Sequence, residues 1–294
     1  MKHVMIAAVL LCVGSVAGMA DDALSGPSFT LWQLPEQSPT QMQSYVVRTV
    51  HGKVMVVDGG NKAEAPYLKG FLAALGNRVE TWFVSHPHPD HVDALNEILD
   101  APGKLNIAEI VGSLPTTEWL EEHCNGDAAL QVTTLLERAK AHKIPIRDVF
   151  LGETFSGDGV RVRILGVRNP EIYSNGVNNS SMVWRMCDDY KSVLFTGDIG
   201  VEGSEKLLRG AFRQDLRSDY VQMSHHGQNG AVEAFYVAAS PRYCLWPTPR
   251  WLWDNDNGGG KGSGPWRTLE VRAWMKKLGV RRHYVSKDGL HRID

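Results

Sequence analysis

The sequence predicts an α/β fold in which packed β-sheets are covered by helices. Short apolar strands open the chain, strands then alternate with segments of helical periodicity, and no internal repeat or long linker divides them. The chain has 294 residues, of which 43% are hydrophobic and 22% charged, which is ordinary for a globular protein with a sizeable core. The formal net charge of −2 indicates no bulk electrostatic attraction to nucleic acid or to an anionic membrane.

The first half of the chain begins with a hairpin and continues with alternating elements. The two-residue gap at His51 and Gly52, between two apolar runs, indicates a hairpin turn. Strands are expected at residues 29–34, 44–50, 53–60, 80–86 and 107–113. Helices are expected at residues 66–75, 93–100 and 128–143, where apolar side chains recur with helical spacing.

The second half of the chain contains more strands than helices. Apolar runs of strand length occupy residues 160–166, 180–188, 191–198, 218–227, 233–239, 242–246, 281–286 and 289–293. A helix is expected at residues 268–278. Residues 246–266 depart from this pattern, because Trp246, Trp251, Trp253 and Trp266 surround a centre rich in Gly, Asn and Asp, which predicts a long loop. These tryptophans either wall a pocket, where they stack on a base or a cationic head group, or anchor the loop in the core.

The N-terminus has the pattern of an export signal. A polar start at Lys2 and His3 precedes an apolar run from Val4 to Val13, and small residues precede the acidic pair that begins at Asp21. The alternative is an uncleaved membrane anchor, but the apolar run is short for a membrane span. We therefore expect residues 1–20 to be removed, and a periplasmic or secreted protein without stable membrane association afterwards.

Three cysteines remain after such cleavage, namely Cys124, Cys187 and Cys244. An exported protein permits one disulfide, but the odd number and the absence of a CxxC pair leave its members open. Cys187 and Cys244 lie in strand-like runs, where buried free thiols are the ordinary expectation.

The most informative stretch is HPHPDH at residues 86–91, between a predicted strand and a predicted helix. His86, His88, Asp90 and His91 carry imidazole and carboxylate groups, which bind zinc and similar divalent ions. A strand-to-helix corner is a place where a rigid scaffold presents ligands to solvent. The spacing therefore predicts a metal site rather than a polar turn.

Two later segments also place ligand-type side chains at strand ends. Gly197 and Asp198 follow one apolar strand, and His225 and His226 follow the next. A carboxylate at a strand end can bridge two metals, whereas only one of two successive histidines is expected to face a metal because neighbouring residues point to opposite sides of a strand. Asp58 ends an earlier strand, either as a carboxylate that holds a ligand histidine in place or as a turn-forming residue.

Together, HPHPDH, the GD pair and HHG at residues 225–227, after an early VVDGG, resemble the metallo-β-lactamase-fold hydrolases. More narrowly, the order NNSS, GDIG and SHHG is similar to the hydrolase domain of ComEC-like DNA-uptake proteins and related exported phosphoesterases. The resemblance implies one hydrolase domain at residues 21–294, with the four-layer αβ/βα sandwich of that superfamily and a metal site at one edge.

The resemblance also implies two divalent metal ions, with zinc expected first and manganese second. One ion would lie near His86 and His88, and the other near Asp90, His91 and one of the adjacent histidines, assigned as His226. Asp198 would bridge the two ions. Many members of the superfamily supply another histidine before the bridging aspartate. Here Asn178 or Asn179 occupies that part of the sequence, with an asparagine turn as the alternative.

The chemistry expected from this site is hydrolysis by an activated water. Two neighbouring divalent ions activate a water and stabilise attacking and leaving oxygens, which suits a phosphodiester. Asp90 would also orient the water, and His225 would steady the developing phosphate charge. Trp251 and Trp253 are the candidate substrate contacts of the long loop. The substrate is expected to be a small molecule or a phosphodiester, and nucleic acid is one candidate. A β-lactam, lactone or thioester hydrolase and a noncatalytic metal-binding protein are the alternatives.

Overall fold

The computed structural model describes residues 26–124 and 126–294, so the predicted export signal lies outside the described residues. Fourteen strands in this part of the chain form two seven-stranded sheets. The first sheet contains β1 (Phe29–Gln33), β2 (Ser44–Thr49), β3 (Val54–Asp58), β4 (Arg78–Val84), β5 (Asn106–Gly112), β6 (Ile146–Asp148) and β14 (His291–Ile293). The second contains β7 (Thr154–Gly157), β8 (Val160–Gly166), β9 (Val183–Cys187), β10 (Ser192–Phe195), β11 (Tyr220–Gln222), β12 (Tyr243–Trp246) and β13 (Arg282–Val285).

The two sheets are built in the same way. The first has the order β14-β1-β2-β3-β4-β5-β6, and the second has the order β13-β12-β11-β10-β9-β8-β7. In the first sheet, neighbouring strands pair antiparallel along β14-β1-β2-β3 and parallel along β3-β4-β5-β6. In the second, β7 to β10 pair antiparallel and β10 to β13 pair parallel. Each sheet therefore has a parallel half, whose strands all end at the same edge, where ligands and active sites commonly lie.

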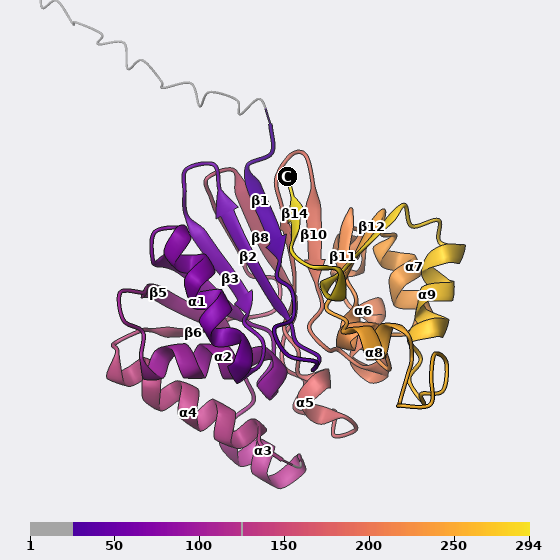
Figure 1. The fold of residues 1–294 in the computed structure, drawn as a ribbon, viewed down its shortest axis with the longest axis horizontal. Helices are drawn as coiled ribbons and strands as arrows, with labels where there is room; N and C mark the ends of the chain where they lie inside the picture. Colours follow the sequence, from indigo (N-terminus) through magenta and orange to yellow (C-terminus); the bar gives the residue numbers. More distant parts are fainter. Residues whose placement is uncertain (1–25, 125) are drawn as a thin grey trace, which may run out of the picture.

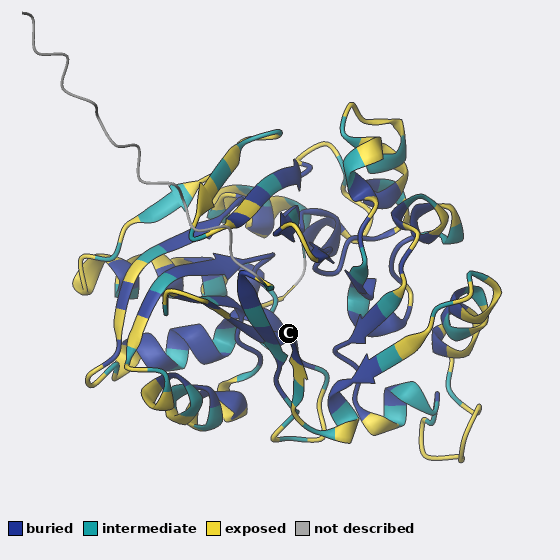
Figure 2. Cartoon of the chain, turned by 90° about the horizontal axis from the view of Figure 1, so that it is seen from above, coloured by how far each residue is buried: buried dark blue, intermediate teal, exposed yellow. Residues whose placement is uncertain are grey.

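Helices cover the outer face of each sheet (Figure 1). Helices α1 (Ala65–Ala74), α2 (Pro89–Asp100) and α4 (Ala128–Ala141) pack on the first sheet through one apolar cluster. Helices α6 (Val201–Arg209), α7 (Glu233–Ala239) and α9 (Thr268–Lys277) pack on the second through another. A third cluster fills the space between the sheets. In Figure 2 the buried residues follow the strands between these layers. The predicted four-layer αβ/βα sandwich is thus confirmed.

Shorter helices join these elements. They are α3 (Thr117–His123), α5 (Gly176–Asn179), α8 (Arg250–Trp253), and the single 3₁₀ turns η1 (Lys62–Glu64), η2 (Arg213–Leu216), η3 (Ser224–Gly227) and η4 (Ser286–Asp288). Helix α5 lies at the lower edge of the sheets in Figure 1. In the described part of the chain, no helix has the length and apolar character that a membrane crossing requires, and the cysteines Cys124, Cys187 and Cys244 are free thiols.

Most predicted elements are present within a few residues, but one prediction of type was wrong. Residues 233–239 form helix α7 instead of a strand. Phe235, Tyr236 and Ala239 are its buried side chains, and their spacing places them on one helical face against the second sheet. The run contains aromatic and β-branched residues, so its composition resembles that of a strand. Strands β6 and β7 and helices α5, α6 and α8 were not predicted.

Candidate metal centre

The predicted ligands meet at the edge where the parallel strands of both sheets end. Asp58 is the last residue of β3, and His86 follows β4 by two residues. Asp90 belongs to the first turn of α2, which begins at Pro89. From the second sheet, Asp198 follows β10 and His226 lies in η3, directly after β11. The chain order of the two sheets thus brings segments more than a hundred residues apart to one place.

Two groups of side chains in the described residues have the geometry of metal ligands. We call Asp90, His91, Asp198 and His226 the four-ligand position. His86, His88 and Asp198 form the three-ligand position. Within each group the ligand atoms lie within 4.8 Å of one another, and Asp198 belongs to both. This arrangement has the form of a dinuclear centre with a shared carboxylate.

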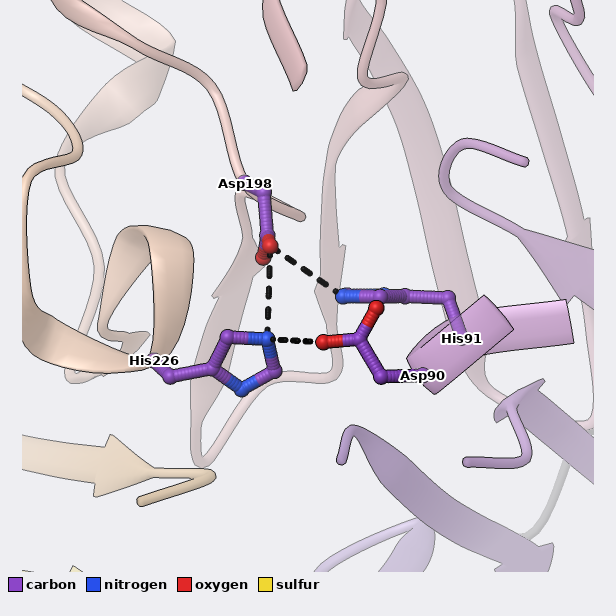
Figure 3. Close-up of side chains that lie close together, drawn as sticks. All are labelled: Asp90, His91, Asp198 and His226. Atoms are coloured by element: carbon purple, nitrogen blue, oxygen red, sulfur yellow. Dashed lines mark ion pairs between the residues drawn. The ribbon is translucent and has the colours of Figure 1, made fainter. Parts of the chain in front are cut away.

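The side chains of the four-ligand position converge on one point (Figure 3). The Nε2 atom of His226 lies 2.9 Å from Oδ2 of Asp90 and 3.3 Å from Oδ2 of Asp198. The Nε2 atom of His91 also lies 3.3 Å from Oδ2 of Asp198. The two histidine side chains are fully buried, whereas the Asp90 side chain keeps 14% of its surface exposed. The only solvent-facing side of the group is therefore that of Asp90.

The orientation of the histidines shows that these residues fit a divalent cation. Nδ1 of His226 lies 2.8 Å from the carbonyl oxygen of Pro247. Because a carbonyl oxygen can only accept a hydrogen bond, Nδ1 carries the proton, and in the neutral ring Nε2 presents a lone pair. Nδ1 of His91 donates in the same way to the Asp58 carboxylate at 2.8 Å. Both Nε2 atoms and Oδ1 of Asp198 are buried without a hydrogen-bond partner. Lone pairs that face carboxylates repel them unless a cation lies between.

Protons compete with such a cation for the same nitrogen atoms. Burial by itself would lower the pKa of His226, but Asp198 and Asp90 raise it to about 9. Burial likewise opposes the charged form of His91, yet the carboxylates of Asp198, Asp58 and Asp90 raise its pKa well above the usual range. For Asp90 burial favours the neutral acid, but His91 and His226 lower its pKa. The same two histidines lower the pKa of Asp198 against the effect of burial. The aspartates therefore remain anionic and attract either protons or a metal.

The three-ligand position is held by fewer contacts. Nε2 of His86 lies 3.0 Å from Nδ1 of His88 and 3.8 Å from Oδ2 of Asp198. Burial is the largest effect on both rings: it lowers the pKa of His86 well below the usual range and also lowers that of His88. Neutral imidazole is the form that binds a metal, so these rings are suited to that role.

Uncharged residues outside the predicted set hold the ligands in place. Asp58 accepts hydrogen bonds from the Ser85 amide at 2.7 Å and from Nε2 of Gln43 at 2.8 Å, in addition to His91. Nε2 of Gln41 donates to Oδ2 of Asp90 at 3.0 Å. Gln41 accepts in turn from Nε2 of Gln228 at 3.0 Å. No motif marks these residues in the sequence. Ser85 is the exception, because its position directly before the HPHPDH motif places it next to a predicted ligand.

The backbone at the second-sheet ligands is constrained. Gly197 has φ of +52°, and a Cβ atom added there would lie 2.7 Å from Oγ of Ser181. This contact explains why glycine precedes Asp198, whose amide donates to the same Ser181 oxygen at 2.9 Å. His225 and His226 both adopt left-handed conformations, with φ of +51° and +56°. Such conformations cost about 1–3 kcal/mol and concentrate at functional sites. They let the two adjacent rings point in different directions.

The structure separates the remaining predicted residues into two sets. His225 does not join the four-ligand position: its Nε2 lies 3.4 Å from Nδ2 of Asn178, and its Nδ1 lies 3.2 Å from the carbonyl oxygen of Asn229. Asn178 is buried, and its Oδ1 atom has no hydrogen-bond partner. Asn179 instead uses its side chain within the scaffold. Its amide oxygen accepts from the backbone amides of Gly200 and Gly203 at the start of α6. Its nitrogen donates to the carbonyl oxygen of Ser174 and to the carboxylate of Glu202.

The tryptophans of the long loop mainly anchor it. Trp246 is fully buried, and Trp253 packs edge-on against it with ring centres 5.2 Å apart. The guanidinium group of Arg272 lies 4.0 Å from the Trp253 ring, on the side of α9. Trp251 differs, because its ring lies tilted against Trp266 and its Nε1 donates to the carbonyl oxygen of Pro39 at 3.0 Å. Trp251 thereby ties the long loop to the segment that carries Gln41.

Comparisons with known proteins agree with this geometry. The sequence profile described as the metallo-beta-lactamase superfamily matches residues 38–235. The metallo-beta-lactamase fold protein YhfI from Bacillus subtilis has a TM-score of 0.54 and 11% identity, over 90% of this chain and 99% of YhfI. CmlA, a diiron beta-hydroxylase from Streptomyces venezuelae, has a TM-score of 0.53 and 14% identity, over 92% of this chain and 54% of CmlA. At these identities the similarity concerns the fold alone. No curated protein sequence matches the chain.

Proposed function

The chain belongs to the metallo-β-lactamase superfamily, and on that premise we propose that it is an exported, metal-dependent hydrolase of phosphodiester bonds. The observation that carries the proposal is the composition of the two metal positions. Their ligands are imidazole nitrogens and carboxylate oxygens only. The described cysteines lie outside both positions, and Cys187 and Cys244 are buried. A site of oxygen and nitrogen ligands without thiolate favours hard ligands such as phosphate oxygens.

The metal ions, when bound, would lower the pKa of a water molecule and stabilise negative charge on phosphate oxygens. Asp90 is the ligand with a solvent-facing carboxylate, so it is placed to accept a hydrogen bond from the attacking water and to orient it. His225 lies half-buried beside Asn178. In this position His225 would steady the charge that develops on a phosphate oxygen.

Motif order supports the phosphodiester rather than another ester. The segments NNSS, GDIG and SHHG, which resemble ComEC-like DNA-uptake hydrolase domains and related phosphoesterases, all contribute to this edge of the fold. NNSS supplies Asn178 beside His225 and Ser181 behind Asp198. A β-lactam substrate would need a cation for its carboxylate. Lys261 and Arg250 on the tryptophan loop are the two candidates, and Lys261 already lies 3.8 Å from the Asp254 carboxylate.

A two-substrate assay tests the proposal. The purified protein is given bis(p-nitrophenyl) phosphate and a chromogenic cephalosporin at equal concentration, first with Zn²⁺ and then with Mn²⁺. We expect faster hydrolysis of the phosphodiester with at least one metal, and hydrolysis at least about 100-fold slower by Asp198→Asn under the same conditions. A preference for the cephalosporin under both metals would reject the phosphodiester proposal in favour of a lactam or related hydrolase. A lactone and a thioester are assayed in the same way. If the protein binds metal but hydrolyses none of the four substrates, it is a noncatalytic metal-binding protein.

Export is part of the same proposal and has its own measurement. The apolar segment that ends in GMA before Asp21 supports it. Mass spectrometry of periplasmic or secreted material should find a chain that begins near Asp21. A full-length product confined to the cytosol would contradict export and leave the catalytic proposal intact.

A further inference from the structure

We propose that the two metal positions bind their ions with unequal affinity. The four-ligand position would fill first and tightly, and the three-ligand position would fill second and exchange readily, with the side-chain oxygen of Asn178 as its fourth ligand. This inference concerns metal binding alone and does not depend on which bond the protein hydrolyses.

The first support is the number and charge of the ligands. The four-ligand position offers two carboxylates, Asp90 and Asp198, and two imidazoles. The three-ligand position offers two imidazoles, and its only carboxylate is the one it shares through Asp198. When both positions are filled, Asp198 divides its charge between two ions. The attraction for the ion beside His86 and His88 is correspondingly weaker.

The second support is the set of contacts behind each ligand. In the four-ligand position, a carboxylate holds His91, a carbonyl oxygen holds His226, and an amide holds Asp90. In the three-ligand position, Nδ1 of His86 lies 3.1 Å from Oγ of Ser85, which already donates to Asp58. The His88 ring is only partly buried, and among the described residues it has no hydrogen-bond partner besides His86. Loss of such supporting contacts typically weakens metal affinity by about 10–100-fold.

The third support concerns Asn178, which we assign as the ligand that completes the weaker position. Asn178 is 3% exposed, and its Oδ1 is one of the buried polar atoms without a partner. Its Nδ2 donates to Asn175 at 2.9 Å and lies 3.4 Å from Nε2 of His225. A buried amide oxygen without a hydrogen bond is costly unless something electropositive approaches it. A metal ion beside His86 and His88 would meet that need. An amide oxygen carries no charge, so this ligand is weaker than a carboxylate.

Calorimetric titration of the metal-free protein with Zn²⁺ tests the inference without an activity assay. We expect two binding steps whose dissociation constants differ by at least about tenfold. His88→Ala should abolish the weaker step and leave the tighter one unchanged, whereas His226→Ala should weaken the tighter step. The intact tighter step in His88→Ala also shows that this variant folds. Two steps of equal affinity, or loss of the tighter step in His88→Ala, would overturn the proposal.

Asn178→Asp tests the fourth ligand separately, because the substitution keeps the size of the side chain and adds a negative charge. We expect the weaker step to tighten by at least about tenfold while the tighter step stays within about twofold. Asn175, whose side chain can rotate to offer its nitrogen, can still pair with the new carboxylate. A weaker step that does not change, beside an unchanged tighter step, would show that Asn178 does not face the metal. Inactivity towards phosphodiesters would bear on the proposed function and leave these binding results untouched.

Discussion

At the scale of single residues, Asp198 stands out because one carboxylate serves both metal positions. Its side chain is 2% exposed, Oδ2 approaches three histidines, and Oδ1 has no hydrogen-bond partner. Its backbone fixes its place, because Gly197 precedes it and Oγ of Ser181 accepts a hydrogen bond from its amide. The charge of this residue therefore matters to the metals more than to the fold.

We expect Asp198→Asn to lower kcat/KM for the phosphodiester by at least about 100-fold and to reduce metal content below one equivalent. The amide has the shape of the carboxylate without its charge, so the melting temperature of the metal-free variant should stay within a few degrees of the metal-free parent. Steady-state kinetics, elemental analysis and thermal melting measure the three quantities. Near-parental turnover would show that Asp198 is not the shared ligand.

Asp58 acts through another residue. Its Oδ2 accepts hydrogen bonds from the side chains of His91, Gln43 and Ser85, and its Oδ1 accepts one from the Ser85 amide. Both oxygens therefore act as acceptors in every contact. An asparagine amide in either orientation would put a donor against a donor. Asp58 also has φ of +57°, a conformation that asparagine tolerates well.

Asp58→Asn is therefore expected to fold and to bind the tighter metal about 10–100-fold more weakly, because the His91 ring loses its orientation. Competition with a chromogenic chelator measures this affinity. Asp158→Asn provides a matched control, since Asp158 is also an aspartate with positive φ, but it bonds Thr49 and Lys53 elsewhere on the molecule. Equal affinities in the two variants would contradict a supporting role for Asp58.

At the scale of elements, the connection from β1 to β2 closes over the start of α2. The side chain of Gln41 donates a hydrogen bond to the Asp90 carboxylate. In addition, the backbone amide of Gln43 donates to the backbone carbonyl oxygen of Asp90 at 3.0 Å. Gln228, which follows η3, bonds to Gln41 from the opposite sheet. This connection thus fixes Asp90 from outside the predicted motif.

We predict that Gln41→Ala raises the dissociation constant of the tighter metal by about tenfold, because the Asp90 carboxylate gains freedom to rotate. Gln37→Ala is the control. Gln37 lies on the same connection and is exposed, and its side-chain nitrogen donates only to the carbonyl oxygen of Pro35 within the same turn. Calorimetry with Zn²⁺ on both variants measures the difference. An effect of equal size in Gln37→Ala would mean that the whole connection was disturbed, and would remove the specific role of Gln41.

The same connection shows which parts of the site could be predicted from the sequence. His86, Asp198 and His226 lie within a few residues of the ends of apolar strands, and Asp90 lies in the first turn of the helix after one of them. Strands that end at one sheet edge bring such residues together. Gln41 lies about fifty residues before its partner, in a segment without periodicity, and an uncharged side chain gives no signal of chemistry. The choice between His225 and His226 also required coordinates, because it depends on two left-handed backbone conformations.

At the scale of the whole molecule, the metal ligands come from both halves of the sandwich. Asp90 and His91 start a helix that packs on the first sheet, whereas Asp198 and His226 follow strands of the second. Bound ions would therefore connect the two halves at one edge, in addition to the apolar cluster between the sheets. A ligand that binds only the folded state stabilises it by mass action.

Removal of the metals should for this reason lower the melting temperature of the protein. An ion present at 100 times its dissociation constant contributes about 2.7 kcal/mol, which for a protein of this size corresponds to a shift of about 4–5 °C. Differential scanning calorimetry before and after exhaustive chelation measures the shift, and added Zn²⁺ should restore the original value. His226→Ala removes a ligand from the tighter position, so its melting temperature should change much less on chelation. An unchanged melting temperature in parental protein whose metal loss was verified by elemental analysis would show that the ions do not join the two halves.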